Sequence, residues 1–297
     1  MLSAAGAAGV ALFTVSVGDG SGERFAPAAV VQSEPIPLAP MDALNHLPSQ
    51  AFWIGERMIA VSGGHAEESP GTMEIGVFDP SKEKWLDVTQ PPLQSRDGYS
   101  AVWTGDYLVI WGGANDNGAL ADGARYDPRV DEWRDLPPAP IAPRSGQAAA
   151  WTGTEVVVQG GSSCCQEESE LFADGAAYDP ATDAWRQIPL PPDGQRSGAV
   201  AVWTGTQMIV WGGIGGHGLL SDGIAYSPDS NTWDPIEAAP IAGRIGMAAV
   251  WNGDEVVVWG GQRCLMVPRS STTERPTTPS GDNGVTSARP RSPLGAT

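Results

Sequence analysis

One phrase of thirteen residues recurs along this 297-residue chain and constrains its fold more than any other feature. The sequence AVWTGDYLVIWGG at 101–113 returns nearly unchanged as AVWTGTQMIVWGG at 201–213. Three related copies also end in Gly-Gly, and the second glycines of the five copies fall at 64, 113, 161, 213 and 261, with spacings of 49, 48, 52 and 48 residues. A self-similar period near 50 residues indicates an array of one supersecondary unit that packs against copies of itself.

A second, shorter phrase accompanies these copies. An aromatic residue, an Asp-Pro or Ser-Pro pair and a Trp follow the first four copies, as FDPSKEKW at 78–85, YDPRVDEW at 126–133, YDPATDAW at 178–185 and YSPDSNTW at 226–233. Apolar runs such as YLVIW predict strands, and the Thr-Gly or Asn-Gly before them predicts a hairpin turn. The proline predicts the end of a third strand, because proline has no N–H for the ladder. With the Trp in a fourth strand, each repeat has the four antiparallel strands of a propeller blade.

In combination, the Gly-Gly pair, the Tyr-Asp-Pro phrase and the Trp resemble the Kelch repeat over roughly residues 45–261. The resemblance is to exported bacterial Kelch proteins, and it implies an all-β, Kelch-type β-propeller with five recognisable blade repeats. The fifth copy has no aromatic-Asp-Pro phrase and no Trp after it, so we expect the last repeat to be incomplete. The run at 24–40 resembles the proline-rich end of a blade and is a candidate for closing the fifth blade.

Composition divides the chain into three segments. Residues 1–22 are mostly apolar over the length of a signal-peptide core, which predicts a signal-like or anchor segment and a secreted, periplasmic or cell-surface location. Residues 23–262 hold the repeats and are assigned to the propeller. Residues 263–297 are rich in Pro, Ser, Thr and Arg, a composition that buries little apolar surface, and they are predicted to form a disordered tail.

The net charge limits the possible partners. With 35 acidic and 17 basic residues the formal charge is −18, and nucleic-acid binding needs a basic surface, so no nucleic acid is expected as a partner. Membrane attachment is expected only through the N-terminal segment, and the propeller is expected to be a monomer. The three histidines, His46, His65 and His217, are far apart in the repeat, so no metal or other cofactor is expected.

An Arg-x-Gly phrase precedes the second to fifth copies. Chain direction alternates along a blade, which places the connections between blades and the loops after the Gly-Gly pairs on one face. The arginines of this phrase are therefore predicted to surround the mouth of the central channel: Arg96, Arg144, Arg196 and Arg244. In some Kelch proteins this arginine grips acidic peptides, so the resemblance implies a candidate anion-binding site, for which the planar guanidinium is well suited.

A structural interpretation of the same arginines competes with this one. An acidic residue stands four positions before the third-strand aromatic in every complete copy, namely at Glu74, Asp122, Asp174 and Asp222. If each arginine pairs with one of them, the ring is a set of salt bridges that join the blades. Copy one has His46 in place of the arginine, and we expect a ligand to bind beside this gap.

The loops after the Gly-Gly pairs differ from copy to copy, and variable loops on a rigid frame commonly carry binding. We therefore expect a non-catalytic, extracytoplasmic module that binds a protein or glycan on this face. The alternative is a carbohydrate-active enzyme, either a sugar epimerase similar to the Kelch-type sialic acid mutarotase or a glycosidase. The candidate acid–base residues of such an enzyme are His65 with Glu67, or His217.

Overall fold

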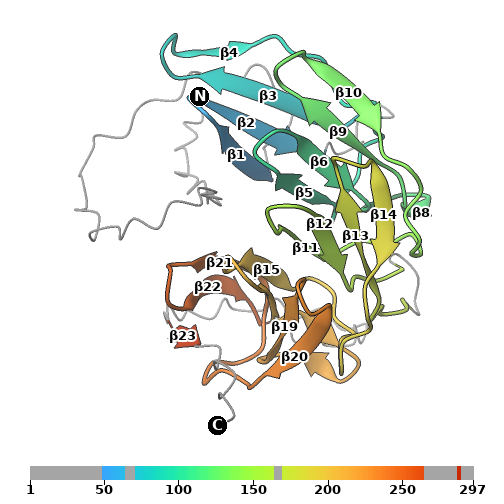
Figure 1. Ribbon diagram of the computed structural model, residues 1–297, viewed down its shortest axis with the longest axis vertical. Coiled ribbons are helices and arrows are strands. Elements are labelled where there is room, and N and C mark those ends of the chain that lie inside the picture. Colours follow the sequence, from blue (N-terminus) through green and yellow to red (C-terminus); the bar gives the residue numbers. More distant parts are fainter. Residues whose placement is uncertain (1–48, 64–70, 164–168, 264–285, 289–297) are drawn as a thin grey trace, which may run out of the picture.

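The computed structural model describes residues 49–63, 71–163, 169–263 and 286–288, and all its described elements are strands. The four four-stranded sheets and the three-stranded sheet are arranged around a common centre (Figure 1), and we call them blades 1 to 5 in chain order; two further sheets are two-stranded. Their first strands lie nearest the centre, and β5, β11, β15 and β21 contact one another in that succession. The predicted all-β propeller architecture is confirmed.

The first four blades have four antiparallel strands each, in the order in which the chain visits them. Blade 1 contains β1 (Gln50–Ile54), β2 (Arg57–Ser62), β3 (Glu74–Asp79) and β4 (Lys84–Leu86). Blade 2 contains β5 (Ser100–Trp103), β6 (Leu108–Trp111), β9 (Gly123–Asp127) and β10 (Glu132–Asp135). Blade 3 contains β11 (Ala148–Trp151), β12 (Val156–Gln159), β13 (Gly175–Asp179) and β14 (Ala184–Gln187). Blade 4 contains β15 (Val200–Trp203), β16 (Met208–Trp211), β19 (Gly223–Ser227) and β20 (Thr232–Ile236).

Blade 5 contains β21 (Ile245–Trp251), β22 (Val256–Gln262) and β23 (Thr286–Ala288). The last strand pairs with β22 so that Ala288 lies opposite Val256. Composition predicts no structure for 263–297, whereas these three residues take the third-strand position, where they cover backbone groups of β22 that would otherwise form an open edge. Residues 264–285 and 289–297 and the run at 24–40 lie outside the described residues.

The Thr-Gly turn between the first two strands is held by the threonine hydroxyl. In blade 2 the Oγ1 of Thr104 accepts the backbone N–H of Tyr107 at 2.9 Å, and Gly105 has a φ of 97°. Thr152 and Thr204 make the same bond in blades 3 and 4, and the side chain of Asn252 replaces them in blade 5. The recurring phrase is therefore explained by local turn chemistry.

The Asp-Pro turn after the third strand is also held by local bonds. The Asp127 carboxylate accepts the N–H of Arg129 at 3.0 Å, and Tyr126 donates its hydroxyl hydrogen to Asp131 at 2.6 Å. Asp131 has a φ of 56°, a left-handed conformation that Asp tolerates better than most residues. The ring of Trp133 packs on Tyr126 with centroids 5.1 Å apart. The phrase thus joins the third and fourth strands of a blade.

We predict that Asp79, in the corresponding turn of blade 1, contributes to stability in a pH-dependent way. Hydrogen bonds from Ser81 and Lys82 lower the pKa of its carboxyl from 3.8 to about 2. Because the folded-state pKa is depressed, this contribution is complete above pH 3.8 and is lost as the pH falls towards 2. Thermal unfolding of Asp79→Asn should accordingly show a smaller loss of Tm between pH 4 and pH 2 than the wild type. Equal losses in the two proteins would contradict the assignment.

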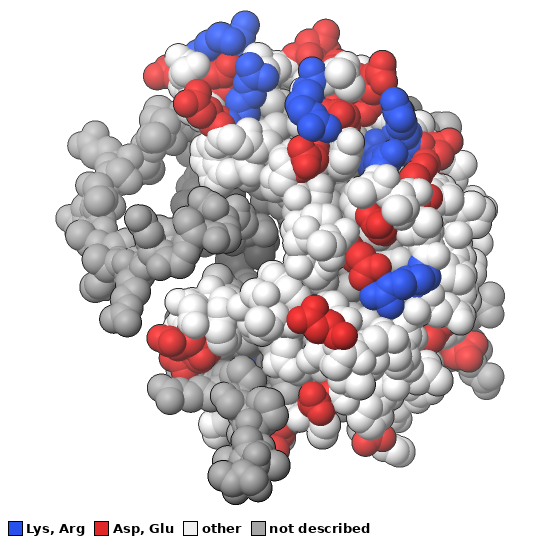
Figure 2. All heavy atoms as spheres, viewed as in Figure 1, with Lys and Arg blue, Asp and Glu red and all other residues white. Residues whose placement is uncertain are grey.

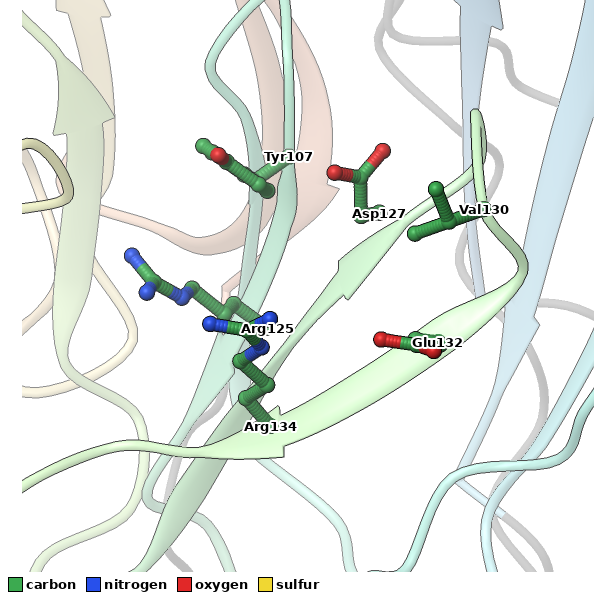
Figure 3. Close-up of a pocket in the computed structure, with 6 residues that line it drawn as sticks. All are labelled: Tyr107, Arg125, Asp127, Val130, Glu132 and Arg134. Carbon is green, nitrogen blue, oxygen red and sulfur yellow. The ribbon is translucent and has the colours of Figure 1, made fainter.

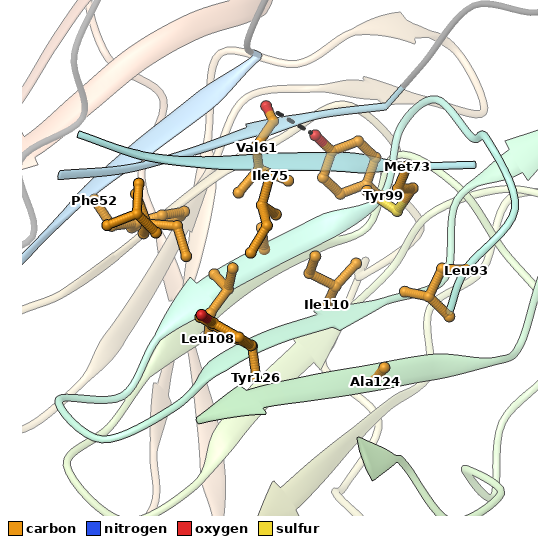
Figure 4. Close-up of a cluster of buried hydrophobic side chains, with 13 residues drawn as sticks. Phe52, Val61, Met73, Ile75, Leu93, Tyr99, Leu108, Ile110, Ala124 and Tyr126 are labelled. Atoms are coloured by element: carbon orange, nitrogen blue, oxygen red, sulfur yellow. Dashed lines mark hydrogen bonds between the residues drawn. The ribbon is translucent and has the colours of Figure 1, made fainter. Parts of the chain in front are cut away.

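The core lies between consecutive blades. The cluster between blades 1 and 2 includes Ile59, Ile75, Leu108 and Ile110, which are at most 1% exposed (Figure 4). Tyr99 enters this cluster, where burial raises the pKa of its hydroxyl to about 12 and the hydroxyl lies 3.5 Å from the Val61 carbonyl oxygen.

The outer-strand tryptophans pack at these interfaces as well. Trp133 lies against the cluster of blades 1 and 2, Trp185 contacts Trp111 of blade 2, and Trp233 is part of the cluster of blades 3 and 4. Two of them also donate to carbonyls of the preceding repeat, Trp133 to Thr89 at 2.9 Å and Trp233 to Pro189 at 2.8 Å. These side chains therefore lie between adjacent blades.

Candidate functional site

Each arginine of the Arg-x-Gly phrase joins two consecutive blades. The carbonyl of Arg144 accepts the N–H of Gly113, in the Gly-Gly pair of blade 2, at 2.9 Å. Its side chain turns into blade 3, where Nη1 donates to the carbonyl of Gly160 at 3.0 Å. Arg96 and Arg196 donate in the same way to the first glycine of their own blades. The arginine therefore links the Gly-Gly turns of neighbouring blades.

The arginines of blades 2 and 3 form two-point ion pairs with an aspartate of their own blade. Arg144 contacts Asp174 through Nη1–Oδ1 at 2.8 Å and Nη2–Oδ2 at 3.2 Å. Arg96 contacts Asp122 at 2.8 and 3.0 Å. Both arginines are at most 1% exposed. Their charge is thus directed at an internal partner, as the structural interpretation predicts, but each ion pair lies within one blade and does not itself join two blades.

The pair in blade 4 is looser. The shortest distance between the Arg196 guanidinium and the Asp222 carboxylate is 3.5 Å, and the buried Nε of Arg196 has no hydrogen-bond partner among the described residues. Burial lowers the pKa of this guanidinium below its ordinary value. Arg196 is nevertheless only 2% exposed, so in this conformation its donors face the protein interior.

The glycine of Arg-x-Gly serves the backbone. Gly146 donates its N–H to the carbonyl of Gly98 at 2.8 Å, and Gly198 donates to Gly146 at 2.7 Å. A Cβ on Gly146 would lie 2.5 Å from the Ser197 hydroxyl. The conformation also favours glycine, because φ is 67° at Gly146. Consecutive blades are therefore hydrogen-bonded to one another at this end of their first strands.

Arg244 of blade 5 keeps the pose of the others without their carboxylate. Its Nε donates to Ala242 at 3.2 Å and its Nη1 to Gly260 at 2.7 Å, the same two bonds that Arg144 makes to Ala142 and Gly160. The side chain is partly exposed, and no described acidic residue forms an ion pair with it.

The register of β23 explains why no carboxylate is expected there. Ala288 lies opposite Val256, as Tyr178 lies opposite Val156 in blade 3. The residue four positions before Tyr178 is Asp174, whereas the residue four positions before Ala288 is Gly284. By this count the sequence offers glycine at that position, and Gly284 itself lies outside the described residues.

The four predicted site residues thus differ from one another. Three are buried against internal partners, whereas Arg244 forms no ion pair with any described residue. Ligand binding by these residues stays a prediction. His46, which takes the place of the arginine in copy one and marks the expected gap in the ring, lies outside the described residues. So do His65 and Glu67, two of the candidate acid–base residues.

His217 is exposed between β17 (Ile214–Gly215) and β18 (Gly218–Leu219), with no hydrogen bond or ion pair to any described residue. The corresponding hairpin of blade 2 is formed by β7 (Ala114–Asn115) and β8 (Gly118–Ala119). Over 49–63, 71–163 and 169–263, the structure contains no cluster of three His, Cys, Asp or Glu residues that would hold a metal ion. The same residues contain no helix of the length and apolarity needed to cross a bilayer.

A second cluster was not singled out from the sequence. It lines a small pocket of about 80 Å³ on blade 2 (Figure 3), formed by Tyr107, Arg125, Asp127, Val130, Glu132 and Arg134. A signal for it existed: the position of Arg125 is occupied by Val77, Ala177 and Ala225 in the other complete repeats. A departure from the repeat is informative because features shared by all blades are explained by the common fold.

Comparisons with known proteins agree with this architecture. The family model described as the KLHDC2/KLHL20/DRC7 Kelch-repeats domain matches residues 49–261. The solved structure of YjhT is similar with a TM-score of 0.58 and 16% sequence identity, and the match covers 71% of each chain. No curated protein matches the sequence. At this identity, the likeness to YjhT concerns the fold alone.

Proposed function

The chain belongs to the Kelch-repeat family represented by that model, and from this premise we propose that it is a binding module for an anionic protein or glycan. The ligand occupies the face that carries the Gly-Gly loops, with Arg244 as its charged contact. The module acts outside the cytoplasm as a monomer, and the apolar stretch within residues 1–22 supports the location.

The single observation that carries this proposal is the donor edge of Arg244, which forms no ion pair with any described residue. Three blades place a carboxylate against the equivalent guanidinium, so the geometry of the position suits a carboxylate. In blade 5 two backbone carbonyls hold the guanidinium in the same pose, which reduces the entropy that a ligand must remove. A carboxylate on a ligand would complete the arrangement that an aspartate completes elsewhere.

We predict that Arg244→Ala weakens binding of the ligand while leaving the fold intact. The purified chain would be applied to a glycan array and to an array of acidic peptides, and the affinity of each hit measured by calorimetry. Loss of one charge-assisted bidentate contact should weaken binding at least about tenfold. The control is Arg57→Ala, which removes the same charge from an exposed residue at the start of β2.

Equal affinity of wild type and Arg244→Ala for every hit would overturn the assignment of this residue. Chemical conversion of a bound sugar would instead favour the carbohydrate-active enzyme as the function.

A further inference from the structure

Two arginines face each other across neighbouring strands of blade 2. In the antiparallel pairing of β9 and β10, Arg125 lies directly opposite Arg134. Side chains at directly opposite positions share one face of the sheet, with Cβ atoms about 5 Å apart, and like charges there destabilise the pair. Figure 3 shows the two side chains lying together in the pocket, near Tyr107. An anionic group on a ligand would offset this repulsion, so its binding here would be favourable.

The conflict occurs in this repeat alone among the four complete blades. The equivalent pairs are Val77 with Leu86, Ala177 with Arg186, and Ala225 with Asp234. The fold therefore does not require two cations here. In proteins, a local rule is commonly broken where function demands it.

Blade 3 shows what the missing partner looks like. Arg186 stands at the position equivalent to Arg134, and it donates to both carboxylate oxygens of Glu155, from Nε to Oε1 at 2.7 Å and from Nη2 to Oε2 at 2.6 Å. Tyr107 occupies the Glu155 position in blade 2, so no carboxylate is supplied from there. Arg134 is exposed, and it has no hydrogen bond or ion pair with any described residue.

Arg125 is fixed in place next to this unpaired charge. Its Nη1 donates to the carbonyl of Pro180 at 2.7 Å and lies 3.8 Å from Asp183, both in blade 3. Its guanidinium lies over the ring of Tyr107, 5.0 Å from the centroid. The side chain is only 11% exposed and is therefore preorganised.

Two carboxylates also line the pocket. The Asp127 carboxylate forms an ion pair with Arg129, through Nε–Oδ1 at 2.8 Å and Nη2–Oδ2 at 2.9 Å. The hydrogen bonds and the charge of Arg129, together with the charge of Arg134, lower the pKa of the Asp127 carboxyl. Glu132 is exposed, lies opposite Asp127 and makes no hydrogen bond within the described residues. Its charge opposes an anionic guest, so neutralising it should strengthen binding.

We propose that Arg125 and Arg134 form a binding site for a single oxyanion group, either a phosphate or sulfate or a ligand carboxylate. Guanidinium groups bind such oxyanions through charge-assisted hydrogen bonds. The pocket is small, with a volume of about 80 Å³, which suits one oxyanion group better than a whole ligand. The site is separate from Arg244, since it lies towards the end of β9 away from the Arg96–Asp122 pair.

The test is titration of the full chain with sodium phosphate, sodium sulfate and sodium acetate, at an ionic strength held constant with sodium chloride. Binding would be followed through the Nε–H signals of Arg125 and Arg134 in NMR spectra. Arg134→Ala should weaken binding at least about tenfold, because Arg134 is the cation without an internal partner. Arg125→Lys keeps the charge but loses the paired N–H donors of the guanidinium, so it should weaken anion binding as well. Glu132→Gln should strengthen anion binding.

Lys84→Ala is the matched control, because it removes one exposed cation from β4 of blade 1 without touching the pocket. It should bind like the wild type. Unchanged affinity in Arg134→Ala, or an equal loss in Lys84→Ala, would overturn the site. Tighter binding of phosphate and sulfate than of acetate would assign the pocket to tetrahedral anions, and the reverse order to carboxylates. Neither result bears on binding by Arg244, which is tested by its own variant.

Discussion

Replacing Arg144 with alanine should lower the free energy of unfolding by about 3 kcal/mol, the low end of the cost of breaking a buried ion pair. The guanidinium is fully buried, bonds to the carbonyls of Ala142 and Gly160, and contacts Asp174 at two points. Removing it leaves those carbonyls without their donor and creates a cavity beside Phe172, whose ring lies 4.5 Å from the guanidinium carbon. The low end applies because the Asp174 side chain is 37% exposed, so water can solvate its carboxylate.

The matched control is Arg244→Ala, in which the same phrase is changed in a blade whose described residues supply no acidic partner. Its loss should be about 1 kcal/mol or less, since the residue is partly exposed and has no ion pair with a described residue. Urea is the suitable denaturant, because guanidinium chloride is a salt and screens ion pairs. A double-mutant cycle of Arg144→Ala and Asp174→Ala then isolates the coupling of the pair. Equal losses in Arg144→Ala and Arg244→Ala would refute the structural role, and unchanged stability with loss of an acidic ligand would favour the binding interpretation.

An even larger loss is expected for Gly160→Ala, about 3–5 kcal/mol, from two additive causes. Gly160 has a φ of 70°, a left-handed conformation that costs an L-residue roughly 1–2 kcal/mol. In addition, a Cβ at this position would lie 2.4 Å from the carbonyl oxygen of Arg196. That oxygen accepts the N–H of Gly161, so the clash falls on the hydrogen bond that links blade 3 to the connection into blade 4.

Gly260→Ala separates the two causes. Gly260 stands at the same position of the phrase in blade 5 and has the same φ of 70°, and no atom of the described residues lies within 4 Å of the place that a Cβ would take. Gly153→Ala provides a second control within blade 3, with a φ of 94° and equally open space. Both should lose only the strain of about 1–2 kcal/mol in urea unfolding. Similar losses at Gly160 and Gly260 would show that close packing between blades contributes little at this position.

Much of the architecture follows from residues that are close together in the chain. The Thr-Gly turn, the Asp-Pro turn and the strands between them depend on contacts within a few residues, as the bond from Tyr107 to Thr104 and the bond from Tyr126 to Asp131 illustrate. Because these contacts are local, the five copies of the phrases were sufficient to predict the repeat and four strands in each complete blade. The same regularity predicted that arginine and aspartate recur together, without deciding whether they pair.

Only the tertiary structure decided which of these side chains meet. Arg144 and Asp174 are 30 residues apart, and their contact depends on how the connection between blades crosses the third strand. The absence of an ion pair between Arg244 and any described residue likewise goes with the register of β23, a strand that no local pattern predicts, whereas the opposition of Arg125 and Arg134 follows from the hairpin around the Asp-Pro turn. The sequence by itself therefore determined the repeat, its turns and its strands, because these arise from short-range backbone and side-chain preferences. The charges left available for a ligand were decided by the tertiary structure, because ion pairing depends on distances between segments that only the packed blades set.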